Sequence, residues 1–255
     1  MKIKYGVLYL LICVILATGC TKKAGSITQL QATDIYPLSV GKVFIYRMDS
    51  TVLNSARTGF LVNTYFAKDS VESQFYDATG RLSFRIFRYI TDTAYQTGWN
   101  YASTIISIFD VNHVEYIENN LKFVTIVQPI SDGITWYGNK YINTDTADNS
   151  GYIPYKYFDK WQYVYQNSNQ PYTVLMGTFD STFTILQQDE LSPNVPVGSV
   201  PYQQKNYSIE IYAKNTGLIY KEFLHWTWQT SYYTDNPLND DGLSYGIKLN
   251  LISVR

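Results

Sequence analysis

The sequence has few of the residues that usually carry catalysis or bind metals. Its 255 residues include only two cysteines, Cys13 and Cys20, and two histidines, His113 and His225. A zinc site needs several His, Cys or acidic ligands at close spacing, and each histidine stands alone in a strand-like run. Neither a G-x-S-x-G elbow nor a glycine-rich phosphate loop is present. We therefore expect no enzyme, no cofactor and no metal site.

A surplus of basic charge is also lacking. Residues 1–19 hold two of the 20 Lys and Arg residues and no acidic residue, so the remainder carries 18 basic against 21 acidic side chains, a net charge of −3. Nucleic-acid binding needs a basic patch or stripe, which this balance does not favour. The sequence predicts no nucleic-acid partner and leaves protein partners unknown.

Long apolar runs are absent beyond the N-terminus. Lys2 and Lys4 precede a small or apolar run over residues 6–17, which is too short for a spanning helix and has the length of a signal-peptide core. The following "ATGC" resembles the lipobox of bacterial lipoproteins, with Ala17 where Leu is usual. That resemblance implies cleavage before Cys20 and a diacylglycerol on its sulfur, which would attach the chain to a membrane. The alternative is an ordinary secretory signal with an incidental cysteine.

Three segments are expected: a signal peptide over 1–19, a lipidated tether over 20–34 and a single β-rich domain over 35–255. Lys22 and Lys23 follow the cysteine, where some Bacteroidota lipoproteins carry an acidic tract that directs export to the cell surface. Their presence favours the periplasmic face of the outer membrane over the cell surface.

From residue 36 onward, short alternating runs rich in Tyr, Phe, Thr, Ile and Val are bounded by turn residues. A hairpin is predicted about Asn119 and Asn120, and another about "KNTG" at 214–217. Evidence for helix is thin beyond the signal peptide. The pattern predicts an all-β fold, with one antiparallel, strongly curved sheet or incomplete barrel like that of lipoprotein carriers and lipocalins. A β-sandwich is the alternative.

Three phrases resemble signatures of Bacteroidota outer-membrane lipoproteins of unknown function. They are YPLSVGKVFIY (36–46), ITWYGNKYIN (134–143) and YAKNTGLIYKE (212–222). The resemblance implies a single β-rich domain anchored in the outer membrane, and it implies no activity.

Aromatic clusters are the remaining positive signal, with packing in the sheet as the simpler explanation. The candidates for ligand contact are Trp136, Tyr155, Tyr157, Trp161, Tyr163, Tyr165, Trp226 and Trp228. Inward rings mixed with Leu and Ile would favour an apolar ligand, and exposed rings flanked by Asp, Asn and Gln would favour a saccharide. Two loops rich in Asp and Asn, at 143–151 and 233–242, fit solvated turns better than calcium sites.

Three functions follow, in order of preference. The first is a lipid-anchored envelope protein that binds an apolar or saccharide ligand without catalysis, which predicts a lined cavity or groove. The second is a structural or interaction module of an outer-membrane complex, which predicts an exposed apolar patch instead. The third is a hydrolase, which predicts a histidine beside a carboxylate and a nucleophile in a cleft.

Overall fold

The computed structural model describes residues 29–55, 59–144, 158–196, 199–229 and 244–255. Its elements in chain order are α2 (Ala32–Ile35), β1 (Val43–Leu53), β2 (Phe60–Tyr76), β3 (Leu82–Asp92), β4 (Asn100–Phe109), β5 (His113–Glu118), β6 (Leu121–Val127), β7 (Thr135–Tyr137), η1 (Phe158–Lys160), β8 (Gln162–Val174), β9 (Gly177–Ser192), β10 (Tyr202–Ala213), β11 (Gly217–Gln229) and β12 (Tyr245–Val254). Within these ranges no helix is both long and apolar enough to cross a bilayer.

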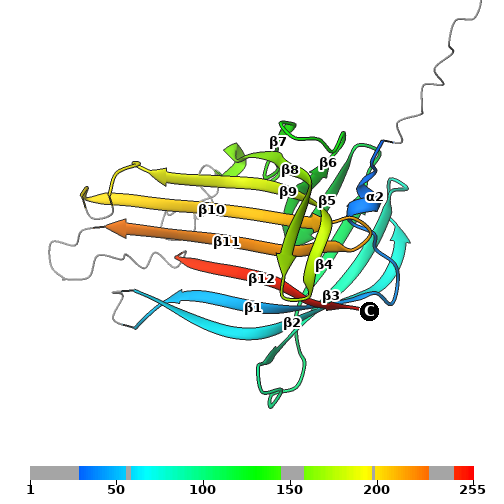
Figure 1. Cartoon of the computed structure of the whole chain (residues 1–255), viewed down its shortest axis with the longest axis horizontal. Coiled ribbons are helices and arrows are strands. Elements are labelled where there is room, and N and C mark those ends of the chain that lie inside the picture. Colours follow the sequence, from blue (N-terminus) through cyan, green and yellow to red (C-terminus); the bar gives the residue numbers. More distant parts are fainter. Residues whose placement is uncertain (1–28, 56–58, 145–157, 197–198, 230–243) are drawn as a thin grey trace, which may run out of the picture.

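All twelve strands form one antiparallel sheet in the order β6-β5-β4-β3-β2-β1-β12-β11-β10-β9-β8-β7. The first and last strands pair at its centre, so the sheet has two arms, β1 to β6 and β12 to β7 (Figure 1). The arms curve toward each other until the sheet is nearly closed into a barrel. The predicted curved, antiparallel all-β fold is confirmed, and the β-sandwich alternative is not observed.

The edge strand β6 meets the other end of the sheet, formed by β7 and the adjoining β8, at a seam closed by hydrogen bonds. Val124 donates its backbone N–H to the Gly138 carbonyl at 2.8 Å, and its carbonyl accepts from Trp136 Nε1 at 2.7 Å. The Tyr165 hydroxyl donates to the Val127 carbonyl at 2.8 Å and accepts from the Val127 N–H at 3.1 Å. Closing an edge removes the row of unpaired backbone groups through which sheets associate.

The hairpin of β8 and β9 bends back over the outside of the sheet, across β10 to β12 (Figure 1). The bend coincides with breaks in register near Asn167 and Asn169, which have φ of 53° and 58°. At the tip, Met176 N–H donates to the Leu251 carbonyl at 2.9 Å, and Leu175 N–H donates to Asn250 Oδ1 at 2.7 Å. The hairpin thus covers apolar side chains on the outer face of β10 and β11.

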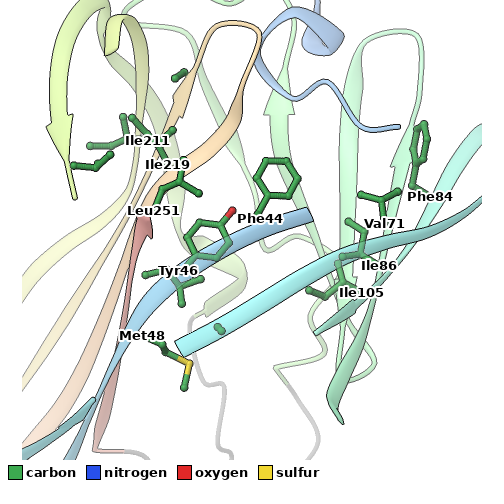
Figure 2. Close-up of a cluster of buried hydrophobic side chains, with 14 residues drawn as sticks. Phe44, Tyr46, Met48, Val71, Phe84, Ile86, Ile105, Ile211, Ile219 and Leu251 are labelled. Carbon is green, nitrogen blue, oxygen red and sulfur yellow. The ribbon is translucent and has the colours of Figure 1, made fainter. Parts of the chain in front are cut away.

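Apolar side chains of β1 form the centre of one core. Phe44, Tyr46 and Met48 point inward and lie opposite residues of β2 to β4 such as Val71 and Ile86 (Figure 2). Alternate positions along β1 therefore face the interior, as a half-buried antiparallel strand requires.

The segment before β1 packs against one end of the barrel. Ile35 is fully buried, and the Tyr36 hydroxyl lies 3.2 Å from Ser107 Oγ. Lys42 Nζ donates to the Pro37 carbonyl at 2.8 Å and to the Thr216 carbonyl at 2.9 Å. The first and third signature phrases thus dock on each other and close this end. Residues before 29, including Cys20, lie outside the described residues.

Candidate functional site

A cavity of about 410 Å³ lies between the two arms of the sheet. Its lining comes from β1, β3 to β6 and β8 to β12, with additions from the segment after β7 and from η1. On β4 and β12 the lining includes Ala102 and Tyr245, which lie among the first residues of these strands. This volume falls within the roughly 300–1,000 Å³ typical of small-molecule sites.

Most of the cavity wall is apolar or aromatic. The apolar and aromatic lining residues are Met48, Ile90, Ala102, Tyr116, Leu121, Phe123, Ile142, Phe158, Trp161, Tyr163, Phe223, Tyr245, Ile247 and Leu249. A wall of this kind attracts apolar surface from water, at roughly 25 cal/mol for each Å² buried.

A group of charged side chains forms the inner end of the cavity, which we call the charged floor: Asp69, Arg88, Glu118, Glu210 and Lys221. All but Asp69 line the cavity itself. A second void of about 20 Å³ touches Asp69, Arg88, Glu210 and Lys221 together with Tyr36 and Tyr46. The floor therefore lies between the ligand-sized cavity and the end closed by α2.

The floor contains two tight ion pairs. Arg88 holds Asp69 with both arms of its guanidinium, Nε to Oδ1 at 2.7 Å and Nη2 to Oδ2 at 2.6 Å. Lys221 Nζ donates to Glu210 Oε1 at 2.8 Å, and the Tyr212 hydroxyl donates to Glu210 Oε2 at the same distance. Each cation thus has its own carboxylate, as buried charges require.

The fifth charge, Glu118, is held mainly by hydroxyl groups. Ser103 Oγ donates to Glu118 Oε1 at 2.6 Å and the Tyr116 hydroxyl donates to Oε2 at 2.8 Å, whereas Arg88 Nη1 is 3.4 Å away. Burial alone would raise the pKa of Glu118, but the charge of Arg88 and these two hydroxyl groups lower it below the usual value. The carboxylate is therefore ionised at neutral pH.

Three β-bulges contribute to the lining. The register breaks between β3 and β4, β5 and β6, and β9 and β10 leave Ala102, Thr125 and Gln187 as the extra residues, and all three line the cavity. Bulges add bend and twist to a strand and redirect a side chain. Here they coincide with the wall of the site, and Ser208 Oγ donates to Gln187 Oε1 at 2.5 Å across one of them.

The predicted ligand contacts divide into groups. Trp161 and Tyr163 line the cavity, with 4% and 2% of their surfaces exposed. Trp136 and Tyr165 lie at the seam, where their polar atoms bind backbone groups of β6. These four residues lie together, and Trp136 packs against both tyrosine rings with centroids 5.7 and 4.9 Å away. Their roles in binding stay predictions.

The other predicted contacts lie elsewhere. Trp226 and Trp228 are on the face of β11 that does not line the cavity, because the cavity-lining positions there are Lys221 and Phe223. Tyr155 and Tyr157 lie outside the described residues, as do most of the loop at 143–151 and all of the loop at 233–242.

Sequence reasoning missed the charged floor, although a signal for it exists. In "FRIFRYI" the alternate positions Phe84, Ile86 and Arg88 lie on one face of the strand, so a charged residue stands on its apolar face. Glu210 gives no such signal, because it alternates with the polar residues Asn206 and Ser208. A charge in the apolar register of a strand is costly unless it is paired, and it therefore marks an interior ion pair.

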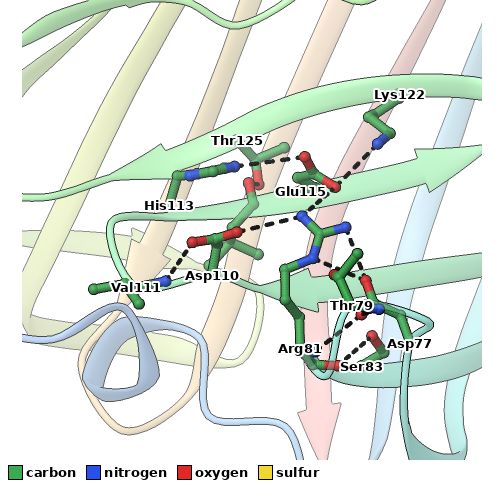
Figure 3. A network of polar contacts seen from close by, with 11 residues as sticks. Asp77, Thr79, Arg81, Ser83, Asp110, Val111, His113, Glu115, Lys122 and Thr125 are labelled. Atoms are coloured by element: carbon green, nitrogen blue, oxygen red, sulfur yellow. Dashed lines mark hydrogen bonds and ion pairs between the residues drawn. The ribbon is translucent and has the colours of Figure 1, made fainter.

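The histidines take part in separate polar contacts. His225 Nδ1 lies 2.6 Å from Oδ1 of the buried Asn206. His113 Nε2 lies 3.5 Å from Glu115 Oε1, in a network with Arg81 and Lys122 (Figure 3). Among the residues that the structure describes, no group of three or more His, Cys, Asp or Glu side chains is placed to hold a metal. Nothing in these ranges indicates catalysis.

No protein-family model matches the chain, and no curated protein gives a significant match. It is similar to a solved structure from Parabacteroides distasonis, provisionally named a lipoprotein, at 11% identity and a TM-score of 0.41, over 89% of this chain and 100% of that one. A DUF1329 family protein from Desulfovibrio piger is similar at 10% identity and a TM-score of 0.18, over 85% and 86% of the two chains. Likenesses this distant say nothing about function.

Proposed function

We propose that this chain is an envelope protein, anchored through lipid on Cys20, that holds a ligand with an apolar body in the cavity between the arms of its sheet. The cavity carries the proposal, because it has the size of a small-molecule site and a mostly apolar wall. Trp161 and Tyr163 supply inward-facing rings, which favour an apolar ligand over a saccharide in this place.

The anchor and the address of the protein rest on the sequence. The signal-like segment before Cys20 supports lipidation, and Lys22 and Lys23 support the periplasmic face of the outer membrane. The substitution Cys20→Ala should release the chain from the membrane fraction that it otherwise occupies. Retention of the variant in the outer membrane would refute the lipid anchor and would leave the proposal of ligand binding in the cavity unaffected.

The cavity is tested by filling it. Ala102→Phe adds a ring to the lining, and Ala94→Phe adds the same ring to the exposed turn between β3 and β4. Wild type and both variants are purified without detergent, denatured and extracted, and apolar compounds in the extract are quantified by mass spectrometry. We expect a co-purifying apolar compound with wild type and Ala94→Phe, and a loss of it with Ala102→Phe. Equal amounts from all three would refute binding in this cavity.

A specific observation favours a second candidate, contact with a saccharide on the outer face of β2 to β4. Tyr95 and Tyr101 are 55% and 60% exposed, and Tyr95 stacks on Phe66 with centroids 5.2 Å apart. Trp99 packs against Tyr95, and the flanking residue Asn100 is exposed. Flat exposed rings among polar groups are suited to stack on sugar rings. Tyr95→Ala should then abolish binding on a glycan array, while Tyr76→Ala, at an exposed tyrosine on β2, should preserve it.

A further inference from the structure

The charged floor carries an excess of negative charge. Within the described residues it contains three carboxylates, on Asp69, Glu118 and Glu210, and two cations, on Arg88 and Lys221. These side chains are between 4% and 26% exposed, so water screens them weakly. A buried group of charges with a net charge of −1 is stabilised by one further positive charge.

Neither cation is arranged to receive an anion. Arg88 Nε and Nη2 are both directed at Asp69, and Lys221 donates to Glu210 while its Nζ lies 5.4 Å from the centre of the Tyr116 ring. An anionic group of a ligand would have to compete with these carboxylates and would increase the local negative charge. Fatty acids and other anionic amphiphiles are therefore poorly matched to the floor.

Glu118 shares its cation with Asp69, because Arg88 directs Nε and Nη2 at Asp69 and only Nη1, 3.4 Å away, at Glu118. Its closest partners are the neutral hydroxyl groups of Ser103 and Tyr116, and it lines the cavity. The rings of Tyr116, Phe123, Trp161 and Phe223 line the same space. Aromatic rings stabilise a desolvated cation through their faces, and recognition of quaternary ammonium groups uses such walls.

We propose that the ligand of this cavity is an amphiphile with a single positive charge, an ammonium group beside Glu118, and an apolar body along the aromatic wall. The inference rests on the proposed function and adds the charge of the ligand. The ammonium group brings the floor to neutrality, and the apolar body occupies the part of the cavity toward Ile247 and Tyr245.

Three compounds with the same apolar chain test the charge: octyltrimethylammonium, octanoate and 1-octanol. Each is titrated calorimetrically at neutral pH into the full chain carrying Cys20→Ala, which is not acylated. We expect octyltrimethylammonium to bind at least about tenfold more tightly than 1-octanol, and octanoate more weakly than both. If none of the three binds, the proposed function fails and the inference falls with it. If all bind equally, or octanoate binds best, the function stands and the inference is overturned.

Two substitutions test where the ammonium group binds, and they should change the affinity for octyltrimethylammonium in opposite directions. Glu118→Gln keeps one oxygen that can accept from Ser103 or Tyr116, and its amide NH2 group can donate to the other hydroxyl oxygen. The substitution should weaken the binding of octyltrimethylammonium about tenfold or more and leave the binding of 1-octanol unchanged. Lys221→Gln removes a nearby positive charge and should increase the affinity for octyltrimethylammonium. Glu72→Gln, at an exposed position of β2, is the matched control and should change nothing. An unchanged affinity in both floor variants, with circular dichroism like wild type, would place the ammonium group elsewhere and overturn the inference.

Two sources could supply this chemistry, a membrane lipid with an amine headgroup and a free long-chain amine. Mass spectrometry of the organic extract from the purified wild-type chain separates them, and either class supports the proposal. A fatty acid or another anionic amphiphile as the extracted compound overturns it.

Discussion

The ring of Tyr163 lies directly against Gly138, and it leaves no room there for a side chain. A Cβ at this position would overlap three carbons of the ring, and the Tyr163 hydroxyl donates to Oδ1 of the adjacent Asn139 at 2.5 Å. Tyr163 and Asn139 both line the cavity. The glycine of the second signature phrase is therefore a steric requirement of the cavity wall.

Gly138→Ala should displace the Tyr163 ring and break its hydrogen bond to Asn139. We expect a loss of about 3 kcal/mol in the free energy of unfolding, since both overpacking and a buried unpaired hydroxyl contribute. Chemical denaturation measures it. Gly59→Ala is the control, because its Cβ would meet only Asn54 Nδ2, at 3.8 Å, and its cost should stay below about 0.5 kcal/mol. Similar costs at both glycines would contradict the steric requirement.

Tyr165→Phe should weaken the seam between β6 and β7. The substitution removes the hydroxyl that serves both backbone groups of Val127, and leaving such groups unpaired costs about 1–3 kcal/mol. Hydrogen exchange measures the effect directly, as a loss of protection at the Val127 amide. Tyr137→Phe, at a half-exposed tyrosine of β7, should leave that amide protected. Unchanged exchange in Tyr165→Phe would show that the seam holds without its hydroxyl.

Lys42→Met should loosen the closed end of the barrel. The Lys42 ammonium joins the Pro37 and Thr216 carbonyls, and burial lowers the pKa of this lysine. Because a hydrogen bond to a charged group contributes about 1.5–3 kcal/mol, we expect a loss of about 2 kcal/mol in the free energy of unfolding, measured by thermal or chemical denaturation. Lys214→Met, at an exposed lysine of the neighbouring turn, should cost far less.

Alkaline pH should destabilise the fold steeply. Burial raises the pKa of Tyr46 well above its usual value, and the negative charge of Asp69 adds to the shift. A raised pKa stabilises the native state below the unfolded value near 10, and this stability is lost as pH rises toward the folded value. The other tyrosines whose pKa burial raises in the same direction are Tyr36, Tyr116, Tyr163, Tyr165, Tyr172, Tyr207, Tyr212 and Tyr220.

Tyr46→Phe isolates one of these groups. Above pH 10 each buried tyrosine contributes a slope of up to about 1.4 kcal/mol for every pH unit, and the variant should lack one such contribution. Its stability at pH 7 should fall by only about 1 kcal/mol, the usual value of the lost hydrogen bond to the Leu218 carbonyl. Urea denaturation between pH 7 and 11 measures both the slope and the stability at neutral pH. Parallel plots of stability against pH for wild type and variant would contradict the raised pKa of Tyr46.

Glu115→Gln should weaken the outer-face network of Figure 3. Burial alone would raise the pKa of Glu115, but Lys122 at 3.1 Å and Arg81 at 3.3 Å lower it. A lowered pKa stabilises the fold above the unfolded value near 4.3, and this stability is lost as pH falls. The variant should lose about 2 kcal/mol at pH 7 and show a shallower decline below pH 5. Glu72→Gln, on the exposed side of β2, is the control for urea titrations across this range.

The turns of this fold were predictable because their chemistry is local. Asn119 and Asn120 adopt φ of 51° and 62° between β5 and β6, as the predicted hairpin requires. The "KNTG" turn is confirmed as well, with Asn215 and Gly217 at φ of 61° and 122°. These residues tolerate the left-handed region in any context, so a short window of sequence suffices.

The cavity was not predictable in detail, because its parts are not local. Arg88, Glu118, Glu210 and Lys221 come from four strands, and only the closing of the sheet brings them together. Alternation also fails at a bulge such as Ala102, where the partner strand and not the sequence pattern decides the register. Alternation alone could not show which face of β11 meets the cavity, because both faces carry apolar residues. Those on the outer face are covered by the bent β8–β9 hairpin.

The pairing of β1 with β12 makes the last residues of the chain decisive for the whole molecule. The ten residues of β12, Tyr245–Val254, pair with β1 on one side and with β11 on the other. They thereby join the arm of β1 to β6 to the arm of β7 to β11. A chain that emerges with its N-terminus first must keep β1 half-unpaired until β12 arrives. A premature stop before residue 245 would therefore remove the central ladder, and it would leave two half-sheets that meet at the seam beside β6 and at the closed end. Each would carry one part of the cavity wall and neither would carry the whole.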